Sequence, residues 1–112
     1  MSASDPNPPR LPLAGLRVLA VEQYGAGPCG THYLAELGAE VVKVEHPARG
    51  DDTRDWGLRV GKTETPYFNS MNRNKRSVTV DLSKDEGRKL VLDLAREFDV
   101  VLQNFKTGGA EK

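Results

Sequence analysis

The chain has 112 residues, which is the length of one small domain. Its 16 basic and 16 acidic side chains give a formal net charge of zero, whereas a domain that binds nucleic acid usually carries a basic excess, so we expect no nucleic-acid partner. No apolar run approaches the roughly 18 residues of a membrane-spanning helix, and we expect no association with a membrane.

The N-terminal segment is rich in proline and polar residues. Residues 1–13 lack the apolar core of a signal peptide and are predicted to form a flexible tail, so that the domain itself runs over 14–112. The chain has one cysteine, Cys29, which leaves no second thiol for an internal disulfide. Both features favour a location in the cytoplasm.

The first regular elements form a β-α-β unit. Branched apolar residues fill 16–21 between turns that contain glycine, and this run predicts a buried strand. Pro28 suits the first turn of a helix, where its missing N–H costs nothing, and Gly38 suits the position just after the helix ends. A second strand is predicted over 40–45. The two strands of such a unit lie parallel.

A long connection follows the second strand. Residues 46–66 are charged, contain several glycines and prolines, and show no sustained period, so they are predicted to form a long loop of the kind that often carries function. A short helical turn is expected over 67–71. Alternating apolar residues then predict a third strand over 76–82.

The last third of the chain predicts a helix and a strand. Ser83 and Glu86 have the spacing of a capping box, in which each side chain satisfies a free N–H group of the other residue. A fourth strand is expected over 99–103. The helix between them is predicted to bury one apolar face, made of Leu90, Val91, Leu94, Ala95 and Phe98.

Strands that alternate with helices predict an α/β fold with a Rossmann-like parallel sheet built of βαβ units. An open parallel sheet needs helices on both faces, and only residues 104–112 follow the fourth strand. We therefore expect the sheet to be truncated after that strand.

The turn after the first strand spells G-x-G-x-x-G from Gly25 to Gly30, and Glu45 ends the second strand. This is the context of a dinucleotide fingerprint and supports an NAD- or FAD-binding oxidoreductase. Pro28 removes one of the backbone donors that a pyrophosphate would need, and the turn is longer than the fingerprint expects. A sharp turn without any dinucleotide explains the same glycines, so both interpretations remain open.

Other reactive side chains have simpler explanations. Cys29 lies in the first helical turn with His32 three residues along, which allows a nucleophile and its base, but a small buried residue is the favoured interpretation. The adjacent Asp51 and Asp52 favour a solvated, salt-bridged loop over a catalytic pair. The basic cluster at 72–77 fits a phosphate site and a charged strand end equally well. No metal site is expected, because neither histidine has partners at ligand spacing.

Five stretches in a fixed order resemble the class III CoA-transferase family (the CaiB/BaiF type, which includes formyl-CoA transferase). They cover nearly all of residues 12–112. The racemase branch of the same superfamily, which acts on 2-methylacyl-CoA, usually has a shorter loop before the "KRS" strand, so this chain is more similar to the transferase branch. The stretches are "PLAGLRVLAVEQYGAGP", "LAELGAEVVKVEHPARGDDTR", "YFNSMNRNKRSVTVDL", "DEGRKLVLDLAREFDVVLQNF" and "GGAEK".

The resemblance implies an enzyme that moves CoA between an acyl-CoA and a carboxylic acid through an aspartyl intermediate. The family places that aspartate well downstream of the "NF" motif, so no catalytic residue is expected within these 112 residues, and the chain is expected to be inactive alone. The family also implies an interlocked homodimer and no metal. The remaining alternatives are the racemase branch, an NAD- or FAD-binding fragment and a non-enzymatic binding module.

The resemblance also implies which residues bind CoA. Tyr24 and Gly25 match the stretch near the thioester end, and His46 stands where some members have a phosphate-binding arginine. The "NF" pair, Asn104 and Phe105, matches residues on the adenine side of CoA. Val80 and Ser83, around the end of the third strand, match positions near the adenosine, and Lys112 matches a region where a basic residue approaches the phosphates. The CoA-binding residues expected in this way are Tyr24, Gly25, His46, Val80, Ser83, Asn104, Phe105 and Lys112.

Overall fold

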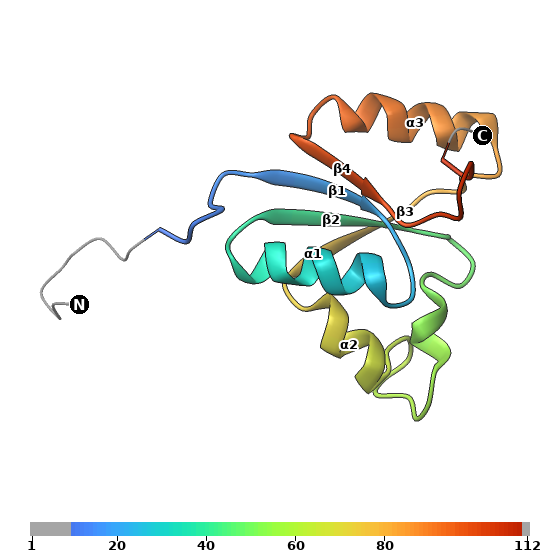
Figure 1. Cartoon of the computed structure of the whole chain (residues 1–112). Helices are drawn as coiled ribbons and strands as arrows, with labels where there is room; N and C mark the ends of the chain where they lie inside the picture. Colours follow the sequence, from blue (N-terminus) through green and yellow to red (C-terminus); the bar gives the residue numbers. More distant parts are fainter. Residues whose placement is uncertain (1–9, 111–112) are drawn as a thin grey trace, which may run out of the picture.

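We describe residues 10–110 of a computed structural model of the chain. Its strands form one parallel sheet in the order β3-β2-β1-β4, with helices on both faces, which confirms the α/β fold with a Rossmann-like sheet (Figure 1). Most of the predicted tail and the expected site residue Lys112 lie outside the described residues. The strands are β1 (Arg17–Val21), β2 (Glu40–Glu45), β3 (Lys75–Thr79) and β4 (Val100–Gln103).

The helices divide between the two faces of the sheet (Figure 1). Helix α1 (Ala26–Glu36) and the short α2 (Pro66–Asn72) lie on one face, and α3 (Asp85–Ala95) covers the other. The predicted long loop contains one further turn, the 3₁₀ helix η1 (Asp52–Asp55). None of the helices within residues 10–110 is long and apolar enough to span a membrane.

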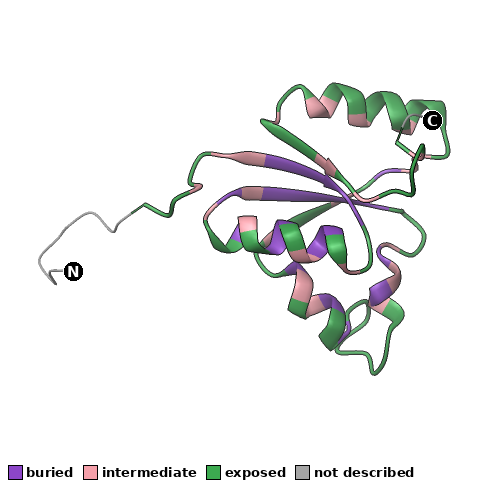
Figure 2. Ribbon diagram, viewed as in Figure 1, coloured by how far each residue is buried: buried purple, intermediate pink, exposed green. Residues whose placement is uncertain are grey.

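The central strands β1 and β2 carry the core, and Figure 2 shows that burial is concentrated in them. Because successive side chains of a strand point to opposite faces, β1 feeds two separate apolar clusters. Val18 and Ala20 pack toward α1 with Ala35 of that helix. Leu19 and Val21 pack toward α3. The fully buried Val18 and Leu19 each stabilise the fold by about 1.5–3 kcal/mol.

The helix end at Gly38 agrees with the sequence prediction. Leu37 is the C-cap, and Gly38 follows it with a φ of 106°, a left-handed conformation that costs glycine little. A Cβ at this position would also lie 2.6 Å from the Cβ of Leu11. The glycine therefore ends α1 and lets the N-terminal segment pass closely beside it.

Three predictions around the third strand and its helix are wrong: the strand does not reach residue 82, the capping box does not form, and one residue of the apolar face is exposed. β3 ends at Thr79, and the carboxylate of Asp81 accepts hydrogen bonds from both the N–H and the hydroxyl of Ser83. The Ser83 hydroxyl is thus engaged outside the helix, and the N-cap is Lys84, without a side-chain capping bond. On the predicted apolar face of α3, Leu90 is 55% exposed, and the packing comes from the other four residues.

The start of α3 approaches the preceding turn so closely that only glycine fits. A Cβ at position 87 would lie 1.9 Å from the carbonyl oxygen of Asp81. Helix propensity alone predicts that alanine in place of a helical glycine stabilises a protein by about 1 kcal/mol. We expect Gly87→Ala to destabilise the chain by about 1–3 kcal/mol in urea unfolding instead, because the backbone must move.

Gly30 of α1 supplies the matched control for this prediction. It has no atom within 4 Å of the position that a Cβ would occupy, so Gly30→Ala is expected to stabilise the chain slightly. Equal shifts of the urea midpoint in the two variants would disprove the close approach of α3 to Asp81.

The topology brings the carboxyl ends of all four strands to one edge of the sheet. The connection after β1 runs through α1 on one face, while β4 is reached through α3 on the other face (Figure 1). In open α/β sheets, ligands bind in the crevice at the point where the strand order reverses in this way. That point lies between β1 and β4.

Candidate functional site

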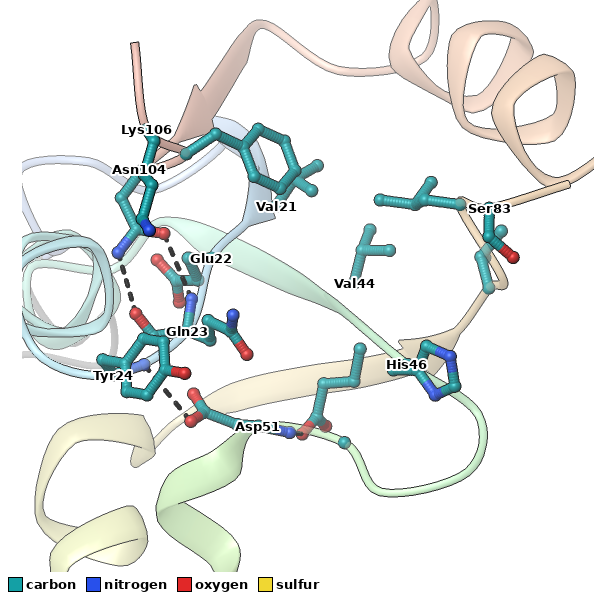
Figure 3. A pocket seen from close by; sticks show the side chains of 15 residues that line it. Val21, Glu22, Gln23, Tyr24, Val44, His46, Asp51, Ser83, Asn104 and Lys106 are labelled. Carbon is teal, nitrogen blue, oxygen red and sulfur yellow. Dashed lines mark hydrogen bonds between the residues drawn. The ribbon is translucent and has the colours of Figure 1, made fainter. Parts of the chain in front are cut away.

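A cavity of about 490 Å³ lies at this edge, at the carboxyl ends of the strands (Figure 3). Strands β1 and β2 line it with their last residues, and β3 and β4 are represented by the segments that follow them. The lining comprises residues 21–24 at the end of β1 and just after it, 44–46 at the end of β2, 50–51 in the following loop, 80, 82 and 83 after β3, and 104–106 after β4.

The cavity has an apolar wall. Val21 and Val44 come from the central strands, and Val80 and Leu82 from the segment after β3. Phe105 adds an aromatic ring that is 45% exposed. Ligand sites of this kind bind flat apolar groups through such walls and fix their orientation with a few polar side chains.

The expected CoA-binding residues are mostly brought together. Six of them line the cavity, namely Tyr24, His46, Val80, Ser83, Asn104 and Phe105. Gly25 is the N-cap of α1 and is not among the lining residues; a Cβ there would be 3.6 Å from the Tyr67 hydroxyl.

Three polar lining residues were not expected from the sequence, namely Glu22, Gln23 and Lys106. Gln23 precedes Tyr24 in the turn after β1, and Lys106 follows the "NF" pair (Figure 3). Their position in the sequence was the available signal, because each of them lies within three residues of the carboxyl end of β1 or β4.

His46 is exposed at the rim of the cavity. Its Nδ1 accepts a hydrogen bond of 3.1 Å from the N–H of Ala48. An acceptor nitrogen carries no proton, so this bond assigns the proton of the neutral ring to Nε2. The ring can therefore donate to a ligand from Nε2 while Nδ1 stays bonded to the protein.

Tyr24 adopts an unusual backbone conformation beside the cavity. Its φ is 70°, and its N–H donates to Oδ1 of Asp51 at 3.2 Å. Its hydroxyl donates to the carboxylate of Asp52, and this bond raises the pKa of Tyr24 above its ordinary value. The ring also packs at 5.7 Å between centroids against that of Trp56. The tyrosine is thus held at both its main chain and its side chain.

A buried network of charges supports the floor of the cavity. Lys43 is 1% exposed, and its Nζ lies 2.8 Å from Oδ2 of Asp51 and 3.5 Å from Oε1 of Glu22. Lys75 reaches the same Oε1 of Glu22 at 2.8 Å, and the hydroxyl of Thr31 donates to that carboxylate. Two carboxylates and two ammonium groups balance, so this floor presents no net charge to a ligand.

The pKa directions in the network follow from this balance. Burial raises the pKa of Asp51, but bonds from Lys43 and Thr53 outweigh burial and leave it below its ordinary value. Burial lowers the pKa of Lys75, and the nearby Glu22 carboxylate only partly opposes this effect. The expectation of a solvated loop at Asp51 is therefore wrong, because its carboxylate is buried and paired with Lys43.

Basic side chains of the cluster at 72–77 bond to other side chains of the protein. Arg73 bonds Nε2 of His32 at 3.1 Å, Lys75 joins the buried network, and Arg76 lies 3.5 Å from Glu40. None of these side chains lines the cavity described above. The structure therefore favours the charged strand end over the phosphate site.

Glu45 is occupied in the same way. Its carboxylate accepts two bonds of 2.8 Å from Arg54, and it also accepts from the hydroxyl of Ser77 and the N–H of Asp51. Burial raises the pKa of Glu45, but these bonds prevail and lower it to about 2. A carboxylate with these partners is not available to the ribose hydroxyls of a dinucleotide, which removes the acidic half of the fingerprint.

Comparison with known proteins identifies the family. The model of CoA-transferase family III matches residues 13–112. The chain is 45% identical over 108 residues to an acyl-CoA transferase of Fusarium pseudograminearum, a match that covers 89% of this chain and 24% of that protein. It is 44% identical over 97 residues to the succinyl-CoA:glutarate CoA-transferase of Homo sapiens, covering 87% of this chain and 22% of that protein.

Solved structures agree with the sequence relatives. The crystal structure of a CAIB/BAIF family protein from Brucella suis is 47% identical with a TM-score of 0.84, over 92% of this chain and 28% of that one. The chain thus spans about a quarter of the length of the relatives it matches. Because the family model covers nearly the whole chain and the fold agrees with that of a solved member, the chain belongs to CoA-transferase family III.

Proposed function

We propose that the chain forms the CoA-binding N-terminal portion of a class III CoA-transferase, which moves CoA between an acyl-CoA and a carboxylic acid. The observation that carries this proposal is the cavity at the carboxyl ends of the strands, with its apolar wall and neutral floor, at the edge where open α/β sheets bind ligands. Relatives named as CoA-transferases support the class of substrate.

The lining suggests how CoA lies in the cavity. The adenine ring packs against Phe105 and the apolar residues around Val80, since an exposed aromatic ring beside aliphatic side chains suits a flat heterocycle. The phosphates lie toward Ser83 and the Nε2–H of His46. The role that the family implies for Lys112, which is outside the described residues, stays a proposal. The thioester end points toward the loop at Tyr24.

Catalysis requires a carboxylate that this region does not supply. Among the described acids near the cavity, Asp51, Glu22 and Glu45 are buried and paired with Lys43, Lys75 and Arg54. A carboxylate held in an ion pair is a poor nucleophile. We therefore propose that an aspartate from sequence beyond residue 112 attacks the acyl-CoA, giving a mixed anhydride and free CoA thiolate.

The chain alone is proposed to bind CoA but not to turn it over. The thiolate would attack the aspartyl carbonyl of the anhydride, form an aspartyl-CoA thioester and release the donor acid as its carboxylate. The acceptor carboxylate would then attack this thioester, giving a second mixed anhydride and free CoA thiolate. Attack of the thiolate on the acceptor carbonyl would form the new acyl-CoA and free the aspartate. We also propose that the complete protein is an interlocked homodimer in the cytoplasm. A free thiol at the half-buried Cys29 agrees with a reducing compartment.

Removing the Phe105 ring tests the proposed adenine position. We expect Phe105→Ala to weaken CoA binding by about 5- to 150-fold, because stacking of a base on an aromatic side chain is worth about 1–3 kcal/mol. The measurement is calorimetric titration of CoA into the protein expressed from its full natural reading frame.

Tyr33 provides the matched control, because it is an aromatic residue that is 64% exposed on α1 and does not line the cavity. Tyr33→Ala is expected to bind CoA like the native protein. Unchanged CoA affinity in Phe105→Ala, or tight binding of NAD with no response to CoA, would argue against the proposal.

A further inference from the structure

The loop 23–25, between β1 and α1, is held by side chains from two distant segments. The N–H of Gln23 donates to Oδ1 of Asn104 at 3.1 Å, and Nδ2 of Asn104 donates back to the Gln23 carbonyl at 2.8 Å (Figure 3). The next N–H, that of Tyr24, donates to Asp51. Two successive peptide groups are thus fixed. Asn104, after β4, bonds both of them, and Asp51, in the loop after β2, also bonds the second.

The G-x-G-x-x-G motif explains how Asn104 reaches this loop. A Cβ at Gly27 would lie 2.9 Å from Cγ of Asn104 and 3.0 Å from Cβ of Glu22. Any side chain at position 27 would therefore displace the asparagine. The central glycine of the motif makes room for Asn104 on the first turn of α1, and this accounts for the glycine without a pyrophosphate.

The pairing has a consequence for Gln23. Its main chain is fully engaged with Asn104, while its side chain is exposed and lines the cavity. Figure 3 shows the Gln23 carboxamide directed into the cavity. Within residues 10–110, no hydrogen bond is made by this carboxamide, so both its donor and its acceptor are open to a ligand.

We propose that Gln23 is a ligand-contacting residue of this cavity, that its carboxamide bonds an amide group of the pantetheine arm of CoA, and that Asn104 is the positioning residue that holds it there. A carboxamide donates and accepts at once, which matches an amide. The proposal rests on the proposed function, since Gln23 adjoins Tyr24 at the thioester end of the cavity.

The first test compares two ligands. Adenosine 3′,5′-bisphosphate carries the nucleotide part of CoA without the pantetheine arm. In the protein expressed from its full natural reading frame, Gln23→Met keeps the length of the side chain and removes its hydrogen-bonding groups. CoA affinity is expected to fall about 3- to 10-fold, as for one lost hydrogen bond, while affinity for the bisphosphate stays unchanged. Equal losses for both ligands would overturn the contact with pantetheine.

The second test asks whether Asn104 acts through Gln23. Asn104→Ala is expected to lower CoA affinity by a similar factor, and the double variant Gln23→Met with Asn104→Ala is expected to lose no more than either single variant. Amide hydrogen exchange at Gln23 should quicken at least tenfold in Asn104→Ala. Additive losses of affinity, or an unchanged Gln23 amide, would overturn the positioning role.

Asn69 on α2 supplies the control, because its amide contacts only Glu64 at 3.4 Å and it does not line the cavity. Asn69→Ala should change neither CoA affinity nor exchange at the Gln23 amide. Failure of the native protein to bind CoA and the bisphosphate alike would overturn the proposed function and the pantetheine contact together. The exchange measurement needs no ligand, so it decides the pairing of Asn104 with Gln23 by itself.

Discussion

Replacing Lys43 with methionine is expected to lower the free energy of unfolding by about 3–5 kcal/mol. Methionine has a similar length and no charge, so the substitution removes the ammonium group with little change in volume. It leaves the carboxylates of Asp51 and Glu22 buried with only Lys75 to balance them. Because a small domain is stable by about 5–15 kcal/mol in total, this loss threatens the folded state itself.

Urea unfolding followed by the fluorescence of Trp56 measures this effect. Trp56 is the only tryptophan, and its ring packs against Tyr24 beside the network, so it reports on the region that is perturbed. Lys89→Met makes the same change at an exposed site on α3 and is expected to shift the stability by no more than about 0.5 kcal/mol. A similar urea midpoint in the two variants would show that the buried charges do not stabilise the fold.

Lowering the pH from 7 to 2 is expected to lower the free energy of unfolding by about 3 kcal/mol through protonation of Glu45 alone. Its pKa is about 2 in the folded chain against 4.5 as the ordinary value. Since the folded pKa is the lower one, the contribution is complete above about pH 4.5 and is lost as the pH falls toward 2, at about 1.4 kcal/mol for each unit of difference. Asp51, whose pKa is also lowered, adds to the loss in the same direction.

The variant Glu45→Gln isolates this contribution. It cannot be ionised, so its unfolding free energy should be lower than that of the native chain at pH 7 and should fall less steeply between pH 4.5 and 2. The measurement is urea unfolding at a series of pH values. Glu86→Gln, at an exposed position on α3, should keep the native slope. An unchanged slope in Glu45→Gln would refute the assignment.

Local sequence predicted the strands of this fold well. The apolar runs at 16–21 and 40–45 could be read directly, because strands buried on both faces need branched apolar residues. The glycine after α1 was equally clear, since few residues adopt its left-handed conformation. These features depend only on neighbours along the chain.

The errors arose where the local pattern allowed more than one arrangement. Ser83 has the spacing of a capping residue, but the carboxylate of Asp81 captures its hydroxyl first. Leu90 fits the helical period of α3, but it is 55% exposed and is not among the α3 residues that pack on the sheet. At Ser83 a competing contact two residues away decided the arrangement, and at Leu90 the packing of α3 on the sheet left the residue outside.

The buried ion pairs could not be predicted from the sequence, because they join segments that are far apart along the chain. Lys43 interrupts an apolar strand, which could have marked it as unusual, but its partners Glu22, Asp51 and Lys75 come from three other segments. The role of Gly27 likewise depends on Asn104, which lies far away in the sequence. The motif could be recognised from the sequence, whereas the reason for its glycine required the fold.

The proposed function depends on the location of the CoA site, and nuclear magnetic resonance tests that location most directly. CoA would be titrated into ¹⁵N-labelled protein and the shift of each backbone amide recorded. We predict the largest shifts at His46, at residues 80–83 and at residues 104–106, which line one end of the sheet. Shifts gathered at the amino ends of the strands, or none at saturating CoA, would contradict the account.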